Sequence, residues 1–105
     1  MVLDNCGAKK IKNPTDEQIQ VELSNLSTKN EDSFAILGQS DMTFIQVSGD
    51  KSVGFAVEYQ DGSVGSHFQA IDKKISLNQV VRAFIAYRAG RPDWKSGFKF
   101  EKITL

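Results

Sequence analysis

Residues 53–62 read VGFAVEYQDG and alternate between large apolar side chains and small or polar ones. Successive side chains of a strand face opposite ways, so the apolar members of this stretch share one side. The closing pair Asp61-Gly62 is typical of a tight hairpin turn. The stretch therefore predicts a half-buried strand that turns back on itself.

Further strand signals lie on both sides of this stretch. Upstream, residues 33–37 (SFAIL) end at Gly38, and residues 42–47 (MTFIQV) end at the turn formed by residues 48–50. Downstream, residues 65–71 (GSHFQAI) supply the returning strand. Because short segments connect these strands, the sequence predicts a four-stranded antiparallel meander.

One helix signal precedes the meander and a second follows it. Residues 13–18 (NPTDEQ) combine an Asn cap, an early proline and capping-box spacing, and they predict a helix over about residues 14–26. Ser76 repeats the capping-box spacing with Gln79, and Gly90 ends the second helix. One broad apolar arc of this helix is expected to pack on the sheet, with Gln79, Arg82, Ala83 and Ala86 opposite.

The last alternating segment, residues 97–103 (GFKFEKI), predicts a final strand. Residues 1–12 are read as a frayed segment or as a short strand near residues 10–12. The element order α-β-β-β-β-α-β predicts one α+β domain over residues 1–105. Its antiparallel sheet has about five strands, and two helices pack on one face.

Composition excludes several classes of protein. The chain has 105 residues, 13 basic and 13 acidic, and its zero net charge argues against a general nucleic-acid binder. One Cys and one His cannot form an internal disulfide or a Cys/His zinc site, so we expect no metal and no cofactor. No apolar run reaches the length of a membrane span, and the N-terminus lacks the apolar core of a signal peptide. We therefore expect a cytoplasmic protein without a membrane partner.

The zero net charge hides an asymmetry along the chain. Residues 13–62 hold nine acids against two bases, whereas residues 63–105 hold eight bases against three acids. Residues 1–12 add three bases and one acid. Either the fold intermixes these charges on one surface, or an acidic face meets a basic partner.

Catalytic patterns are weak. His67 is the only imidazole, and the sequence has no Gly-x-Ser-x-Gly nucleophile elbow. An enzyme would need His67 beside a carboxylate in a cleft. We do not expect such a site, and so we do not expect an enzyme. Trp94 either anchors a protein interface or closes the core between the second helix and the last strand.

Nearly the whole chain, from Asn13 to Ile103, resembles small bacterial immunity-type proteins of polymorphic and contact-dependent toxin systems. The segments that carry the resemblance are NPT (13–15), FAIL (34–37), FIQVSG (44–49), GFAVEY (54–59), DGS (61–63), HFQA (67–70), Val81-x-x-Phe84-x-x-Tyr87 and Trp94-Lys95. The resemblance implies a cytoplasmic α+β protein that neutralises a cognate toxin by binding it. Such proteins are often encoded on mobile elements. The resemblance implies no particular functional residues.

Charge alone suggests where a basic toxin would bind. An acidic face would steer such a partner into contact, and the candidate residues are Glu31, Asp32, Asp41, Asp50, Glu58 and Asp61. The competing hypothesis is a self-associating, dimeric or small-molecule-binding protein. It rests on the sheet face opposite the predicted apolar one, because the residues predicted on that opposite face are small or polar.

Overall fold

The computed structural model describes residues 1–7, 9–29 and 33–103. Over these residues seven strands form one antiparallel sheet in the order β2-β1-β3-β4-β5-β6-β7. The strands are β1 (Val2–Asn5), β2 (Lys9–Lys12), β3 (Phe34–Ser40), β4 (Thr43–Asp50), β5 (Gly54–Asp61), β6 (His67–Ala70) and β7 (Phe100–Ile103). The helices are α1 (Asp16–Ser24) and α2 (Leu77–Arg88), with short 3-10 turns η1 (Val64–Ser66) and η2 (Pro92–Lys95).

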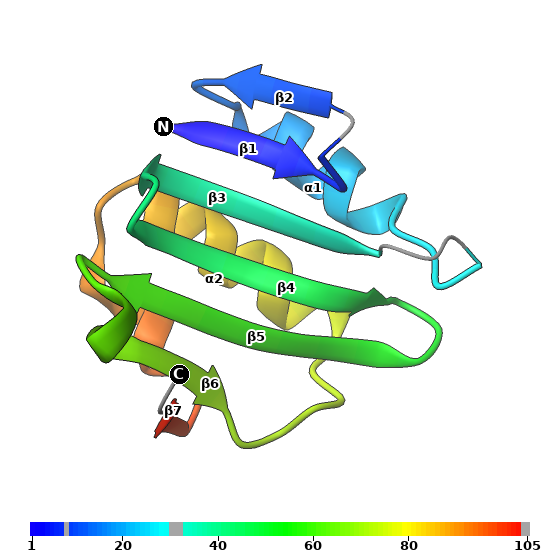
Figure 1. Ribbon diagram of the computed structural model, residues 1–105. Coiled ribbons are helices and arrows are strands. Elements are labelled where there is room, and N and C mark those ends of the chain that lie inside the picture. The colour runs from blue at the N-terminus through cyan, green and yellow to red at the C-terminus, as the bar shows by residue number, and fades with distance from the viewer. Residues whose placement is uncertain (8, 30–32, 104–105) are drawn as a thin grey trace.

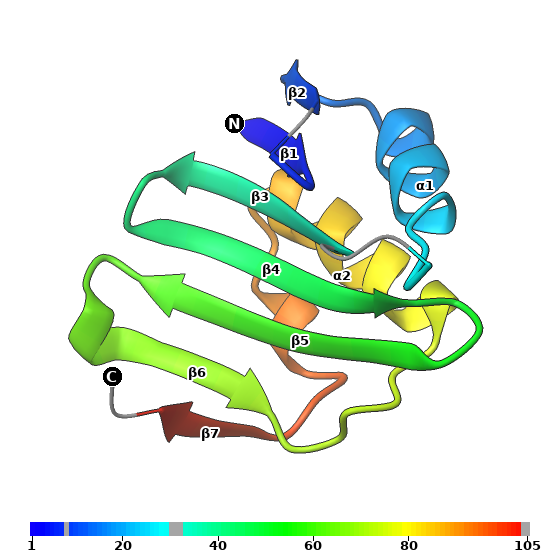
Figure 2. The same ribbon diagram turned by 45° about the vertical axis from the view of Figure 1, so that its right-hand side comes forward.

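The α+β class and the central meander are confirmed, and α1 and α2 lie on the same side of the sheet (Figures 1 and 2). The expectation of about five strands and a leading helix is wrong. An N-terminal hairpin, β1 and β2, precedes α1, so the described chain has seven strands. These four-residue strands place only two apolar side chains, Leu3 and Ile11, toward the helices; Asn5 and Lys9 face the same side and contact Glu22 of α1. Alternation over so few residues gives too weak a signal to identify a strand.

The predicted capping boxes position the helices. In α1 the Thr15 hydroxyl accepts from the Gln18 amide at 3.1 Å, and the Gln18 side chain accepts from the Thr15 amide at 2.9 Å. Ser76 and Gln79 form the same box at the start of α2. α1 is shorter than predicted and ends at Ser24.

The core lies between the helices and one sheet face. A cross-strand row of apolar side chains runs along that face: Ile11, Leu3, Leu37, Ile45, Tyr59 and Phe68. Phe84 of α2 is fully buried against it. Ala83 and Ala86 are buried as well, which corrects the prediction that they lie opposite the apolar arc. Small side chains there let the α2 backbone approach its neighbours closely.

No described element covers the other side of the sheet, which we call the open face (Figures 1 and 2). The strand register places on it two rows of side chains that cross all seven strands, and a shorter row of Phe34, Ser48 and Ala56. The first row is Lys10, Asp4, Ile36, Gln46, Glu58, Gln69 and Glu101. The second row is Lys12, Val2, Gly38, Phe44, Gln60, His67 and Ile103.

Neither α1 nor α2, nor any other helix among the described residues, is long and apolar enough to cross a membrane.

Candidate functional site

Two of the predicted acids meet at one end of the sheet. Asp41 is exposed in the turn between β3 and β4. Asp61 is exposed at the end of β5, where it pairs with Thr43 of β4. The two carboxylates therefore belong to neighbouring turns. Glu31 and Asp32 lie outside the described residues.

Asp50 lies at the opposite end of the sheet and is only 5% exposed. Its carboxylate accepts hydrogen bonds from Ser52, Thr28 and Val53, and these bonds hold the pKa of Asp50 well below its usual range. A buried carboxylate so fully engaged within the chain is not available to a partner. We therefore leave Asp50 out of the candidate surface.

Glu58 projects from the open face into a polar cluster with His67 and Gln60. The His67 side chain is 9% exposed, with Nε2 2.9 Å from Glu58 Oε1 and Nδ1 3.0 Å from Gln60 Oε1. Gln60 Nε2 donates to the Met42 carbonyl at 3.2 Å, which turns its oxygen toward the ring. Phe44 contacts the ring edge-on, at 6.1 Å between centroids.

His67 thus has the neighbouring carboxylate that catalysis would require. Within the described part of the chain, however, its hydrogen-bond partners are Glu58 and Gln60, and neither is a hydroxyl or thiol nucleophile. The ring is held in place by both nitrogens. The cluster is therefore best described as an ordered polar patch of the open face.

Glu101 extends this acidic part of the open face and was missed by sequence reasoning. Gln69 Nε2 donates to Glu101 Oε1 at 2.6 Å, and Gln69 pairs across the sheet with Glu58. The alternation of β7 shows that Glu101 faces away from Phe100. Only the pairing of β7 with β6 reveals that it lies in one row with Glu58.

The charge of the open face changes sign across the sheet. Lys10 and Lys12 lie on the β2 edge, with Asp4 beside them on β1. Glu58 and Glu101 lie on the β5–β7 side. The acidic and basic halves of the sequence are therefore partly interleaved.

A hollow of about 410 Å³ opens on this face between these regions. Ile36, Val2 and Phe44 supply its apolar lining, and Gly38 leaves space because it has no side chain. Asp4 and Asp41 contribute carboxylates to its lining, and Lys10 contributes an ammonium group. The hollow therefore combines apolar walls with two acidic groups and one basic group.

Trp94 packs on the helix side of the sheet. Its ring contacts Tyr59, Tyr87 and Phe100 edge-on, with centroid distances of 4.9, 5.3 and 6.2 Å. The side chain is half-buried. This placement matches the core-closing alternative and leaves part of the ring accessible.

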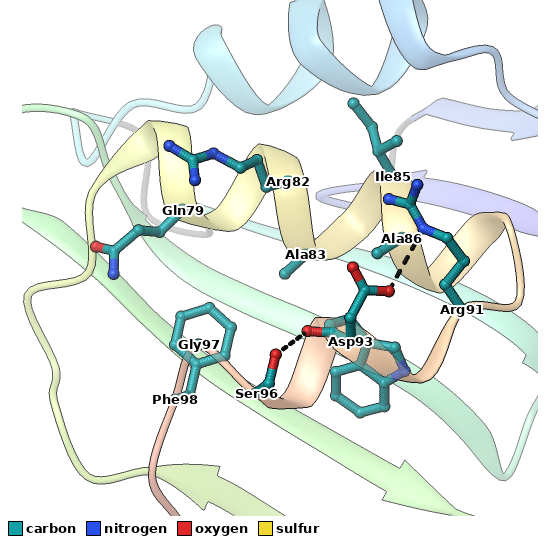
Figure 3. Close-up of a pocket in the computed structure, with 11 residues that line it drawn as sticks. Gln79, Arg82, Ala83, Ile85, Ala86, Arg91, Asp93, Ser96, Gly97 and Phe98 are labelled. Atoms are coloured by element: carbon teal, nitrogen blue, oxygen red, sulfur yellow. Dashed lines mark hydrogen bonds and ion pairs between the residues drawn. The ribbon is translucent and has the colours of Figure 1, made fainter.

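A groove of about 380 Å³ runs between α2 and η2 on the same side (Figure 3). Ala83 and Ala86 lie along it on α2, and Phe98 faces them from beyond η2. Arg91 Nε lies 3.4 Å from Asp93 Oδ1 at one end, so these charges pair within the chain. The groove is mainly apolar, with paired charges at its margin.

Tyr59 and Tyr87 are the chain's two tyrosines, and both lie beside Trp94. Burial, and secondarily the charge of Asp61, raises the pKa of Tyr87 to about 12 and also raises the pKa of Tyr59.

We expect tyrosinate absorbance in the native protein to rise only above pH 10. In denaturant both phenols should titrate near their ordinary pKa of about 10. Because the folded pKa is the higher one, this contribution to stability is complete below pH 10 and is lost as the pH rises toward 12. A native titration with its whole amplitude at pH 10 would contradict the burial of both rings.

Within residues 1–7, 9–29 and 33–103, no group of three His, Cys, Asp or Glu side chains is placed to hold a metal ion. Asp41 and Asp61 lie at one end of the sheet and Asp50 lies at the other, so these three carboxylates do not converge. Compared with protein-family models, curated proteins and solved structures, the chain matches none of them.

Proposed function

We propose that this chain is a non-catalytic binding protein that holds a basic protein partner on its open face. The hollow carries this proposal. Ile36 and Phe44 suit the aliphatic stem of a partner's Lys or Arg. The carboxylates of Asp4 and Asp41 outnumber the single Lys10 ammonium in the lining and suit the charge of that side chain. An uncovered sheet face with apolar and charged side chains is a surface that another protein can cover.

The acids of the open face support a basic partner. Asp41 is exposed beside the hollow, and Glu58 and Glu101 lie on the β5–β7 side of the same face. Asp61 follows Tyr59 by two residues and therefore faces the helix side of the sheet. Complementary charge speeds association and aligns the partner. Together with the immunity-type resemblance, this favours a toxin with a basic surface as the partner, neutralised by direct binding in a bacterial cytoplasm.

The decisive experiment pairs the protein with a toxin domain encoded beside its gene. We expect a complex in surface plasmon resonance at low salt and rescue of growth on co-expression. Changing Asp41 and Glu101, both exposed, to Lys should slow association by about tenfold or more, with a smaller effect on dissociation.

The matched control changes two acids away from this surface, Glu17→Lys and Asp72→Lys, both exposed. Circular dichroism would show that both variants fold. Unchanged association in the Asp41/Glu101 variant, or an equal loss in the control, would refute the proposed surface.

The charge pattern favours self-association as a second candidate function. A second copy turned through a two-fold axis would bring Lys10 and Lys12 of one open face over Glu58 and Glu101 of the other. Light scattering separates the candidates. A stable dimer that dissociates with salt supports this second function, whereas a monomer that binds the toxin supports the first.

A further inference from the structure

A third cavity, of about 260 Å³, lies on the helix side of the sheet beside the end of β5 and combines aromatic rings with a carboxylate. Tyr59 of β5, Tyr87 of α2 and Trp94 of η2 line it, together with Asp61 and Lys95. Trp94 stands nearly perpendicular to Tyr59, at an interplanar angle of 84°. Segments far apart in the sequence thus meet at one aromatic pocket.

The pocket already holds a cation from the chain itself. Lys95 Nζ lies 4.9 Å from the centroid of the Tyr59 ring and 5.3 Å from that of Trp94. Aromatic faces carry negative potential and attract an ammonium group at such distances. Lys95 forms no salt bridge with any described residue, so its ammonium group is held by the two aromatic rings.

A polar group in the pocket has no partner. The Tyr87 hydroxyl is buried and makes no hydrogen bond to the described residues. The residue as a whole is 5% exposed. Buried hydroxyls are normally hydrogen-bonded, so an unpaired one at a cavity marks a position where a ligand can supply the partner. Asp61 is near enough for its charge to act on both tyrosines.

We propose that this pocket binds an organic cation, an alkylammonium or guanidinium group, against Tyr59 and Trp94 with Asp61 as the counter-charge. Lys95 occupies the position when no ligand is bound. Lys95 is exposed, so its flexible side chain can move into solvent when a ligand enters. Competition from this internal ammonium makes binding to the wild-type chain weak. The inference is independent of the toxin partner.

Trp94 is the only tryptophan, and its fluorescence therefore reports on the pocket. The experiment titrates the protein with tetramethylammonium chloride at constant ionic strength, with sodium chloride as the blank. tert-Butanol serves as a neutral ligand of similar shape. We expect a saturable change with the cation and a much smaller response to the alcohol.

Two variants test the assigned roles. Lys95→Ala removes the internal competitor and should tighten tetramethylammonium binding by roughly tenfold. Asp61→Asn removes the counter-charge and should weaken binding by a similar factor. Both residues are exposed, so both variants should fold. In wild type, the ring-shifted proton signals of the Lys95 ε-methylene should move toward ordinary values as the ligand displaces it.

The source of the cation is distinguished by further ligands. Tighter binding of tetramethylammonium than of N-acetyl-arginine amide or N-acetyl-lysine amide indicates a small molecule, and the reverse order indicates a partner's side chain. A fluorescence change that sodium chloride reproduces would overturn the proposal. Equal binding of tert-butanol, or affinities unaltered in both variants, would do the same.

Discussion

Replacing Gly49 with alanine should lower the free energy of unfolding by about 4 kcal/mol, since backbone strain and a steric clash each cost about 1–3 kcal/mol. Gly49 lies in β4 with φ +105°, a conformation that L-residues rarely adopt. An added Cβ would collide with the carbonyl oxygen of Gly54, which is backbone and cannot rotate away. Urea unfolding followed by circular dichroism measures the loss.

Gly62→Ala is the matched control for Gly49→Ala. Gly62 also has a positive φ, +83°, but its added Cβ would meet no atom within 4 Å. Only the conformational cost of about 1–2 kcal/mol remains there. Equal stabilities of the two variants would show that the close approach of Gly49 to Gly54 is not a constraint on the hairpin.

Sequence reasoning succeeded where one signal was local and strong. The alternation of residues 53–60 and the capping boxes at Thr15 and Ser76 each depend on a few adjacent residues. The short strand near residues 10–12 that the sequence allowed is β2, but the hairpin was not predicted, because β1 is stabilised by pairing with β3, which is distant in sequence. Local patterns contain no information on such pairings.

The candidate sites depend even more on pairing. Glu58 and Glu101 share a row only because β6 lies between β5 and β7. Tyr59, Tyr87 and Trp94 meet because α2 crosses behind β5 and η2 follows it. Residue types in the sequence suggested acids and an anchoring Trp94, but the hollow and the aromatic pocket required coordinates.

Asp50 shows how charge counting alone misleads. The sequence places it in a turn among other acids, which suggested an exposed group. In the structure Oδ1 accepts from the Ser52 amide and hydroxyl at 2.9 and 2.7 Å and from the Val53 amide at 3.0 Å. Oδ2 accepts from the Thr28 amide and hydroxyl at 2.7 and 2.9 Å. One oxygen closes the β4–β5 turn, and the other ties the segment after α1 to it.

We therefore expect Asp50→Ala to lower the melting temperature by on the order of 10 °C, because it removes the acceptor of five hydrogen bonds at once. Asp50→Asn should lose less, since its amide oxygen still closes the turn while its NH₂ group cannot accept from Thr28. Asp41→Ala, at an exposed acid, should stay within about 3 °C of wild type. Differential scanning calorimetry measures all three.

The pH dependence of these variants identifies the ionised carboxylate as the stabilising group. The pKa of Asp50 is lowered on folding, so its contribution is complete above the unfolded pKa of about 4 and is lost as the pH falls toward the lowered native value. The melting-temperature gap between wild type and Asp50→Asn should therefore narrow as the pH drops from about 5 toward 2. A gap independent of pH would mean that shape and packing, rather than charge, make Asp50 necessary. If wild type and Asp50→Asn melted at the same temperature at neutral pH as well, the Asp50 carboxylate would not stabilise the fold and would again be a candidate for binding a partner.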